Sequence, residues 1–402
     1  MLTFKKITLW QWLFAWLLLD SLLLYLLRPF FAFPINALLP GLVVLAFVFS
    51  RRTGKLLTNT HIFSMGCVAL GFMLAVALGV ELAWLSFKQT LSAGCGLLIG
   101  YRATRRDQDL RPFLLLLALV GFVYAVICVA ALLGLSSSYL PVIYAQGFHN
   151  GVAVMRAELT TDQNYQIYYL FPIMMGLILK QKLWKTSLLL LGVLGSFYVI
   201  VMMETRSGLL LLLSLLSIIV LLPVWYKQKN SINKVFFLAA IVLLLTIVKL
   251  PEIIDLSQGM IRRFTESDLA TFWGRIISIT YLFEHIFNPL WWIPKGQNVF
   301  LLEYGNFPHS APTSIFLRAG ILGLIGWLML IAWPVMKGLN LVRRRKINIY
   351  QAAIVFGALV SLVASFSLPA AMFEQVWLWG GACWGVVELS KYQSTIAKKR
   401  ND

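Results

Sequence analysis

The chain alternates long apolar stretches with short polar connections from one end to the other. Each apolar stretch is about 20 residues long, which is the length of helix that crosses the ~30 Å hydrocarbon core of a bilayer. Continuous apolar runs predict helices, because a transmembrane β-barrel would alternate apolar and polar residues along each strand. We therefore predict an all-α polytopic membrane protein, with one integral membrane domain over residues 1–402.

The pattern predicts about twelve transmembrane helices. They lie at roughly 7–27, 30–49, 61–80, 84–101, 112–134, 166–180, 185–203, 208–226, 235–250, 313–336, 349–367 and 372–390. The first stretch contains Asp20 and has no small-residue cleavage site after it, so we expect a retained helix rather than a signal peptide.

Composition supports this class, since 60% of the residues are hydrophobic and 12% are charged. The net charge of +18 is explained by lysines and arginines in every second loop, such as Arg343 to Lys346. The positive-inside rule then predicts that both termini are cytoplasmic, and no polyanionic partner such as nucleic acid is needed. The four cysteines lie inside apolar stretches without metal-ligand spacing, so we expect no metal site and no cofactor.

This topology leaves two sizeable loops on the extracytoplasmic face, at 136–165 and 250–312. In the longer loop, apolar residues recur at helical spacing, and a pair of tryptophans follows in "NPLWWIP". This combination predicts a helical loop in which one helix lies on the membrane surface. The apolar positions are Phe272, Ile276, Ile279, Phe283 and Ile286.

Arginines on this face are candidates for binding phosphate, because the positive-inside rule disfavours them there. Arg206 lies in the turn "ETRSG", where Glu204 could hold its guanidinium. Arg275 is the one cation in the amphipathic stretch. An arginine fork suits bidentate binding of phosphate or pyrophosphate, although a cation at a helix end can also be incidental.

His309 stands just before an apolar span that contains Arg318. Histidine is the usual general base near neutral pH, although a loop histidine can have no role. A cation inside a span is a candidate functional residue. Gly320, Gly323 and Gly326 form a small-residue face that predicts close packing of this span against a neighbour.

Four stretches, in this order, resemble the O-antigen ligase and polymerase family. "RAELTTDQNY" is similar to the family's arginine and asparagine (Arg156, Asn164), and "ETRSG" to its threonine–arginine turn (Arg206). "GRIISITYLFEHIFNPLWWIPKGQN" is similar to its glycine–arginine, helix, proline and glycine segment (Gly274, Arg275, Pro289, Gly296). "HSAPTSIFLRAGILG" is similar to its histidine motif (His309, Gly320, Gly323). The chain departs from the pattern at Ser310, where the family usually has asparagine, and at Asn298, where it has a second glycine.

The resemblance implies an enzyme of the bacterial inner membrane with a periplasmic active site. Such enzymes transfer a glycan from a polyprenyl pyrophosphate carrier to an acceptor sugar hydroxyl. His309 would be the base, and Arg156, Arg206 and Arg275 would bind the pyrophosphate, without a metal. Glu204, Asn164, Ser310 and Arg318 would support them. We favour a ligase that uses lipid A–core as acceptor, with a repeat-unit polymerase that uses a second carrier-linked glycan as the alternative.

A membrane transporter is the alternative from another class. Asp20, Lys88, Arg318 and Glu374 fall within predicted spans, and intramembrane charges are typical of transport pathways. Transport sites lie near the middle of the bilayer, however, whereas Arg206, Arg275 and His309 are predicted on one aqueous face.

Overall fold

The computed structural model describes residues 7–18, 58–105, 109–132, 143–149, 152–157, 191–195, 225–226, 269–305, 307–366 and 374–401. The chain divides into two compact units. The C-terminal unit comprises residues 7–17, 35–108 and 270–402, and the middle unit comprises 1–6, 18–34 and 109–269.

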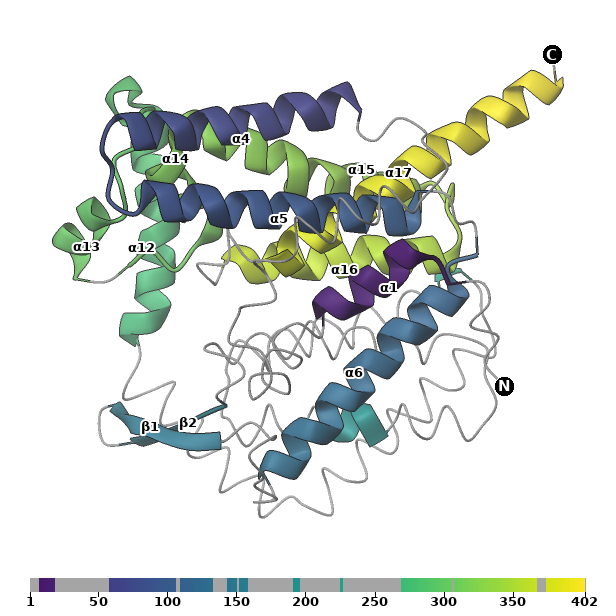
Figure 1. Ribbon diagram of the computed structural model, residues 1–402, viewed down its shortest axis with the longest axis horizontal. Coiled ribbons are helices and arrows are strands. Elements are labelled where there is room, and N and C mark those ends of the chain that lie inside the picture. Colours follow the sequence, from purple (N-terminus) through teal and green to yellow (C-terminus); the bar gives the residue numbers. More distant parts are fainter. Residues whose placement is uncertain are drawn as a thin grey trace. The chain divides into compact units, whose positions relative to one another are not determined.

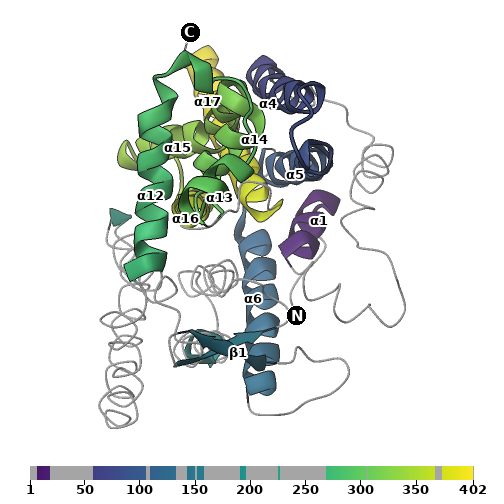
Figure 2. The same cartoon turned by 90° about the vertical axis from the view of Figure 1, so that its left-hand side faces the viewer.

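The described elements of the C-terminal unit are helical. Helices α4, α5 and α14 to α17 run alongside one another, whereas α12 crosses their direction at one end (Figures 1 and 2). That end also holds α13 and the turn between α4 and α5 (Figure 1). The helices are α1 (Leu9–Leu18), α4 (Asn59–Ala77), α5 (Ala83–Thr104), α12 (Leu269–Ile286), α13 (Asn298–Tyr304), α14 (Ala311–Trp327), α15 (Trp333–Arg343), α16 (Ile349–Phe366) and α17 (Glu374–Asn401), with a 3₁₀ turn at Pro289–Trp291 and a π-helical turn at Leu328–Ala332.

Within the described residues, three helices are long and apolar enough to cross a membrane: Asn59–Ala77, Ala311–Arg343 and Ile349–Phe366. They lie at three of the predicted spans, 61–80, 313–336 and 349–367. Helices α5, α6 (Arg111–Leu132) and α17 lie at 84–101, 112–134 and 372–390, and α1 lies within 7–27. The predicted spans at 30–49, 166–180, 185–203, 208–226 and 235–250 fall outside the described residues, apart from 191–195 and 225–226.

Glycines allow two helix pairs to approach closely. Between α4 and α14, a Cβ added to Gly71 would lie 2.3 Å from the Ala319 carbonyl oxygen, and one added to Gly326 would lie 2.5 Å from that of Ser64. Small residues at a helix interface are typical of membrane proteins. Lipid provides no hydrophobic driving force for helix association, so the helices associate through close backbone packing instead. The close packing predicted for Gly326 is therefore present.

Helices α5 and α17 are just as close, which the sequence analysis did not predict. A Cβ added to Gly100 would lie 2.0 Å from the Leu378 carbonyl oxygen, and one added to Gly381 would lie 2.0 Å from that of Leu97. The Thr104 hydroxyl also donates to the Ala382 carbonyl at 2.7 Å. Small residues four positions apart on both helices, Gly96 with Gly100 and Gly381 with Gly385, are the sequence signal for this contact.

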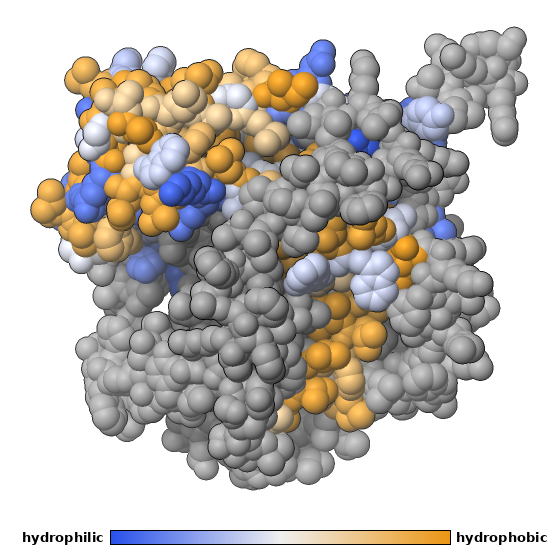
Figure 3. Space-filling view, viewed as in Figure 1, coloured by the Kyte–Doolittle hydropathy of each residue, from blue (hydrophilic) through white to orange (hydrophobic). Residues whose placement is uncertain are grey.

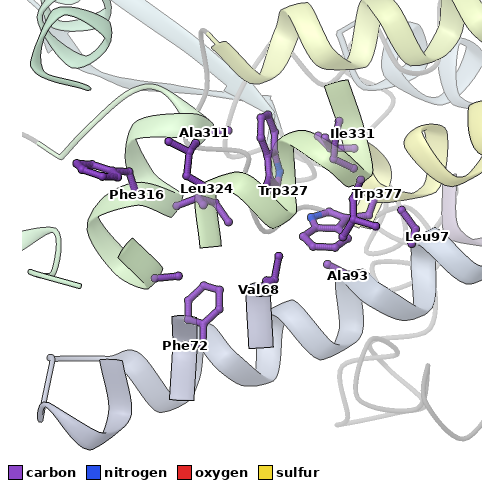
Figure 4. Close-up of a cluster of buried hydrophobic side chains, with 14 of the residues drawn as sticks. Val68, Phe72, Ala93, Leu97, Ala311, Phe316, Leu324, Trp327, Ile331 and Trp377 are labelled. Carbon is purple, nitrogen blue, oxygen red and sulfur yellow. The ribbon is translucent and has the colours of Figure 1, made fainter. Parts of the chain in front are cut away.

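Large apolar side chains fill the space between these helices. Phe72 and Val68 of α4 face Leu324 and Trp327 of α14, and Trp377 of α17 lies beside them (Figure 4). These five residues are at most 1% exposed. On the outside of α4 and α5, hydrophobic side chains predominate among the coloured residues in Figure 3, as expected of a surface that meets lipid.

The π-helical turn at Leu328–Ala332 is explained by Pro334, which follows it in the sequence. In a regular helix the Leu330 carbonyl would accept a hydrogen bond from residue 334, but Pro334 has no N–H. The indole N–H of Trp384 donates to the Leu330 carbonyl instead, at 3.1 Å. This bond ties α17 to the long helix that begins at Ala311.

The middle unit contains helix α6 and an antiparallel hairpin of β1 (Ile143–His149) and β2 (Val152–Ala157). Tyr144 pairs with Arg156, and His149 pairs with Val152. The all-α prediction did not include these strands, which lie within the predicted loop 136–165. Asn150–Gly151 lies between them in the sequence, and this dipeptide is the strongest short-range signal for a hairpin.

Candidate functional site

His309 lies in the segment that leads into α14, and hydrogen bonds to α12 fix its backbone. The His309 N–H donates to the Ser278 hydroxyl at 3.0 Å, and this hydroxyl donates to the Gly274 carbonyl at 2.7 Å. One turn into α14, the Thr313 hydroxyl donates to the Ser278 carbonyl at 2.7 Å. The position of His309 is therefore set by α12 rather than by its own loop.

The imidazole ring of His309 packs against the backbone of α12. A Cβ added to Gly274 would lie 3.6 Å from Cδ2 of His309, so the ring lies over this glycine. Arg275 is the next residue along α12, and both side chains are half-buried. The structure thus brings His309 close to the backbone beside Arg275, a residue 34 positions earlier in the chain.

Other predicted site residues are described in part or not at all. Arg206, Glu204 and Asn164 lie outside the described residues. Arg156 belongs to strand β2 of the middle unit, and only its backbone is described. The predicted grouping of three arginines around one pyrophosphate therefore stays a prediction.

Ser310 is the residue at which α14 begins. It is fully buried, and its carbonyl accepts a hydrogen bond from the Ser314 N–H at 2.9 Å. Its hydroxyl makes no capping bond and has no hydrogen-bond partner among the described residues. The positive end of the helix dipole of α14 consequently lies next to His309, where negative charge is stabilised.

Arg318 holds three parts of the C-terminal unit together. Its guanidinium donates to the Ser86 hydroxyl of α5 at 3.0 Å and to the side-chain oxygen of Gln297. The Gln297 amide in turn donates to the Ser314 hydroxyl on α14. Arg318 is thus engaged by the protein itself, which fits a positioning role better than direct contact with substrate.

Helix α14 is broken at Gly320, which has φ 67° and ψ −165°. The segment Trp292–Gly296, which we call the strap, fills the break. The Ile321 N–H donates to the Trp292 carbonyl at 2.9 Å, and the Leu317 carbonyl accepts from the N–H groups of Lys295 and Gly296 at 3.0 and 2.8 Å. The strap therefore supplies the backbone partners that the break removes from the helix.

This break corrects one sequence prediction. Gly320 was expected to let a continuous span pack against a neighbouring helix, but it opens the helix to the strap. A Cβ there would lie 2.3 Å from the Trp292 carbonyl oxygen. Gly323 does face α4, since its nitrogen would lie 3.0 Å from a Cβ on Gly71. The two glycines therefore have different roles. Gly320 adopts a backbone conformation that favours glycine, and Gly323 allows a close helix contact.

A cluster of aromatic rings continues from this region along α12. His285 stacks on Tyr281 with ring centroids 4.1 Å apart, and Trp291 meets His285 at 4.0 Å. Phe300 and Tyr304 of α13 meet Tyr281 edge-on at 5.0 and 5.8 Å. Burial, followed by the charge of Glu303 and the neighbouring Tyr304, raises the pKa of Tyr281, so its hydroxyl stays protonated. None of the predicted site residues belongs to this cluster.

The opposite face of α12 is apolar and exposed. Phe283 is 62% exposed, and Phe287, one turn further, is 82% exposed. Leu290 and Leu302, in the segments that follow, are 75% and 87% exposed. An exposed apolar face suits a helix that lies on a membrane surface, and the placement of α12 there stays a prediction.

No protein-family model matches this chain, and no curated protein matches it either. Within the part of the chain that the structure describes, no group of three or more His, Cys, Asp and Glu residues could hold a metal ion. Function is therefore inferred from the chemistry of the residues around His309.

Proposed function

We propose that the protein is a membrane glycosyltransferase that transfers a glycan from a polyprenyl pyrophosphate carrier to a sugar hydroxyl. One observation carries the proposal. His309, named from one sequence stretch, packs over Gly274, the residue that precedes Arg275, which was named from another stretch. The acceptor and the lipid carrier would meet there, at the outer surface of the bacterial inner membrane.

In this proposal Arg275 neutralises charge that develops on the pyrophosphate leaving group. The guanidinium fork matches two phosphate oxygens, and fixed cations placed where charge develops lower the barrier. Arg206 and Arg156 would act with it, as the family resemblance implies. The positive end of α14, beside His309, would add to the same field.

His309 acts as the general base that takes the proton from the acceptor hydroxyl. The new glycosidic bond forms between that hydroxyl oxygen and the anomeric carbon, and the carrier pyrophosphate leaves with the electron pair. The support for this role is the fixed backbone of His309, because a base contributes only when it is held within hydrogen-bond reach of its proton. Arginines supply the positive charge, so the proposal needs no metal.

The break in α14 weighs against the transporter alternative. In transporters with broken helices, freed carbonyls and helix ends coordinate the transported ion or substrate. Here the strap occupies the break, and Leu317 and Ile321 bond to it. Arg318 is likewise engaged by Ser86 and Gln297.

Between the two acceptors, we favour lipid A–core, which makes the enzyme an O-antigen ligase. The ground is the form of the histidine motif, "PHS", in the resemblance described above. A repeat-unit polymerase, whose acceptor is a second carrier-linked glycan, is the alternative. A deletion strain separates them: loss of all long glycan on lipopolysaccharide indicates a ligase, whereas core with a single repeat unit indicates a polymerase.

The activity is tested with purified protein in lipid vesicles. Carrier-linked glycan and acceptor are added, and free polyprenyl pyrophosphate is measured by mass spectrometry together with the lengthened acceptor. The proposal expects both products in equal amounts without added metal. Release of neither product, with both substrates present in the vesicles, would refute it.

A further inference from the structure

The ends of α12 and α13 together carry aromatic rings and carboxylates on one exposed surface. Tyr304 is 37% exposed, and Glu284 and Glu303 are exposed beside it. The Glu303 carboxylate accepts a hydrogen bond from the Tyr304 hydroxyl, and the charge of Glu284 also acts on Tyr304. Carboxylates from two helices therefore converge on one aromatic ring. We call Glu284, His285, Trp291, Glu303 and Tyr304 the aromatic–acidic surface.

A buried hydroxyl lies directly behind this surface. Tyr281 is 1% exposed, and its hydroxyl has no hydrogen-bond partner among the described residues. Its ring meets that of Tyr304 edge-on, and the Glu303 carboxylate acts on it electrostatically. Most buried polar groups in proteins are hydrogen-bonded, and exceptions are often found where a ligand or a reaction uses them.

The chemistry of the surface selects its ligand. His285 donates from Nδ1 to the Tyr281 carbonyl at 2.8 Å, which leaves its other ring nitrogen, Nε2, for a further partner. Nε2 and the carboxylates thus offer hydrogen-bond partners for hydroxyl groups, while the carboxylates repel phosphate. Partly exposed aromatic rings, such as those of Trp291 and Tyr304, suit the C–H face of a pyranose ring. A neutral sugar satisfies all of these groups, whereas a pyrophosphate or a phospholipid headgroup does not.

The surface is also within reach of His309 along one rigid element. Ser278 bonds the His309 backbone, and His285 lies seven residues further along α12. At 1.5 Å per helical residue this separation is about 10 Å. A short oligosaccharide can therefore span from this surface to the histidine.

We propose that the aromatic–acidic surface is a glycan subsite that binds a neutral sugar residue a short distance from the transfer point at His309. That the bound glycan runs toward His309 rests on the proposed function, whereas the binding of sugar to this surface does not. The sugar belongs either to the transferred glycan or to the acceptor glycan, and the experiment distinguishes the two.

The experiment measures binding of lipid-free glycans to the purified full-length protein by saturation-transfer NMR and titration. The two probes are the oligosaccharides released by mild acid from the carrier lipid and from the lipid A–core of the strain that carries the gene. Variants Glu303→Gln and Tyr304→Ala remove one acceptor and one ring, respectively. Leu302→Ala is the matched control, because Leu302 lies on the same short helix and is 87% exposed.

The wild-type protein and Leu302→Ala should bind one of the two glycans, and the probe that binds identifies which chain occupies the subsite. Glu303→Gln and Tyr304→Ala should bind it about tenfold more weakly, the loss expected for one charge-assisted hydrogen bond or one stacked ring. Absence of binding by the wild-type protein, or equal binding by all variants, would overturn the proposal. A protein that binds glycan but releases no carrier pyrophosphate would contradict the proposed function and leave this subsite standing.

Discussion

Replacing Gly320 by alanine tests the break in α14 and the strap that fills it. The residue has φ 67° and ψ −165°, a conformation that is essentially restricted to glycine and costs about 1–3 kcal/mol for other residues. The new Cβ would also lie 2.3 Å from the Trp292 carbonyl oxygen and 3.1 Å from Cδ of Pro294. Because this overlap involves backbone, the strap must move.

The free energy lost can be worked from these contacts. Moving the strap breaks up to three backbone hydrogen bonds, those of Ile321, Lys295 and Gly296. At about 1 kcal/mol net for each bond, added to the conformational cost, loss of all three should make Gly320→Ala destabilise the protein by about 4–6 kcal/mol.

Two further glycines separate the contributions. Gly305 has φ 70° and open space around it, so Gly305→Ala should show the conformational cost alone, about 1–2 kcal/mol. Gly66 has open space and a helical conformation, so Gly66→Ala should leave stability unchanged or slightly raised. The assay is thermal unfolding in detergent, followed by tryptophan fluorescence. If Gly320→Ala unfolds at the same temperature as Gly305→Ala, the strap does not fill the break as described.

Three other sets of variants test the pyrophosphate site, the membrane orientation and the Gln297 bridge. Arg275→Lys should lower glycan transfer strongly at wild-type protein levels, because a point charge lacks the guanidinium fork; normal turnover would remove pyrophosphate binding from its role. Cysteines introduced at Leu302, and in the loops of Arg156 and Arg206, should react with an impermeant thiol reagent in whole cells, whereas one at Arg344 should not; the reverse pattern would invert the orientation. Gln297→Ala leaves Arg318 and Ser314 without a shared partner and should destabilise the protein by about 1–3 kcal/mol, whereas Gln297→Glu, which keeps an acceptor for Arg318, should cost less; equal losses in the two would argue against the bridge.

Hydrophobic patterning predicted helix positions well where the spans are long and apolar. The helices at Asn59–Ala77 and Ile349–Phe366 begin and end within a few residues of the predicted spans, because helix length is set by the thickness of the bilayer. The break at Gly320 could not be predicted in this way. The hydrophobic pattern of an apolar run is the same whether its backbone hydrogen bonds lie within the helix or, as at Leu317, are made to another segment.

In the candidate site, too, the sequence predicted some features and not others. His309 and Arg275 could be named from the sequence, because a base and a phosphate-binding cation belong to recognisable residue types. That they lie together depends on Ser278, a small polar residue with no pattern to mark it. The aromatic cluster around Tyr281 was missed for a related reason, since its members come from α12, the 3₁₀ turn and α13 and converge only in three dimensions.

Substitution of His309 by alanine tests the central claim most directly. The backbone N–H still donates to Ser278, so the segment should keep its place and the protein should fold and bind the carrier lipid. A positioned base typically contributes ~10²–10⁴ in rate, so His309→Ala should lose about that factor in the release of carrier pyrophosphate. His149→Ala, which changes a histidine of the hairpin in the middle unit, should stay close to wild type. A His309→Ala protein that releases pyrophosphate at the wild-type rate would contradict the account.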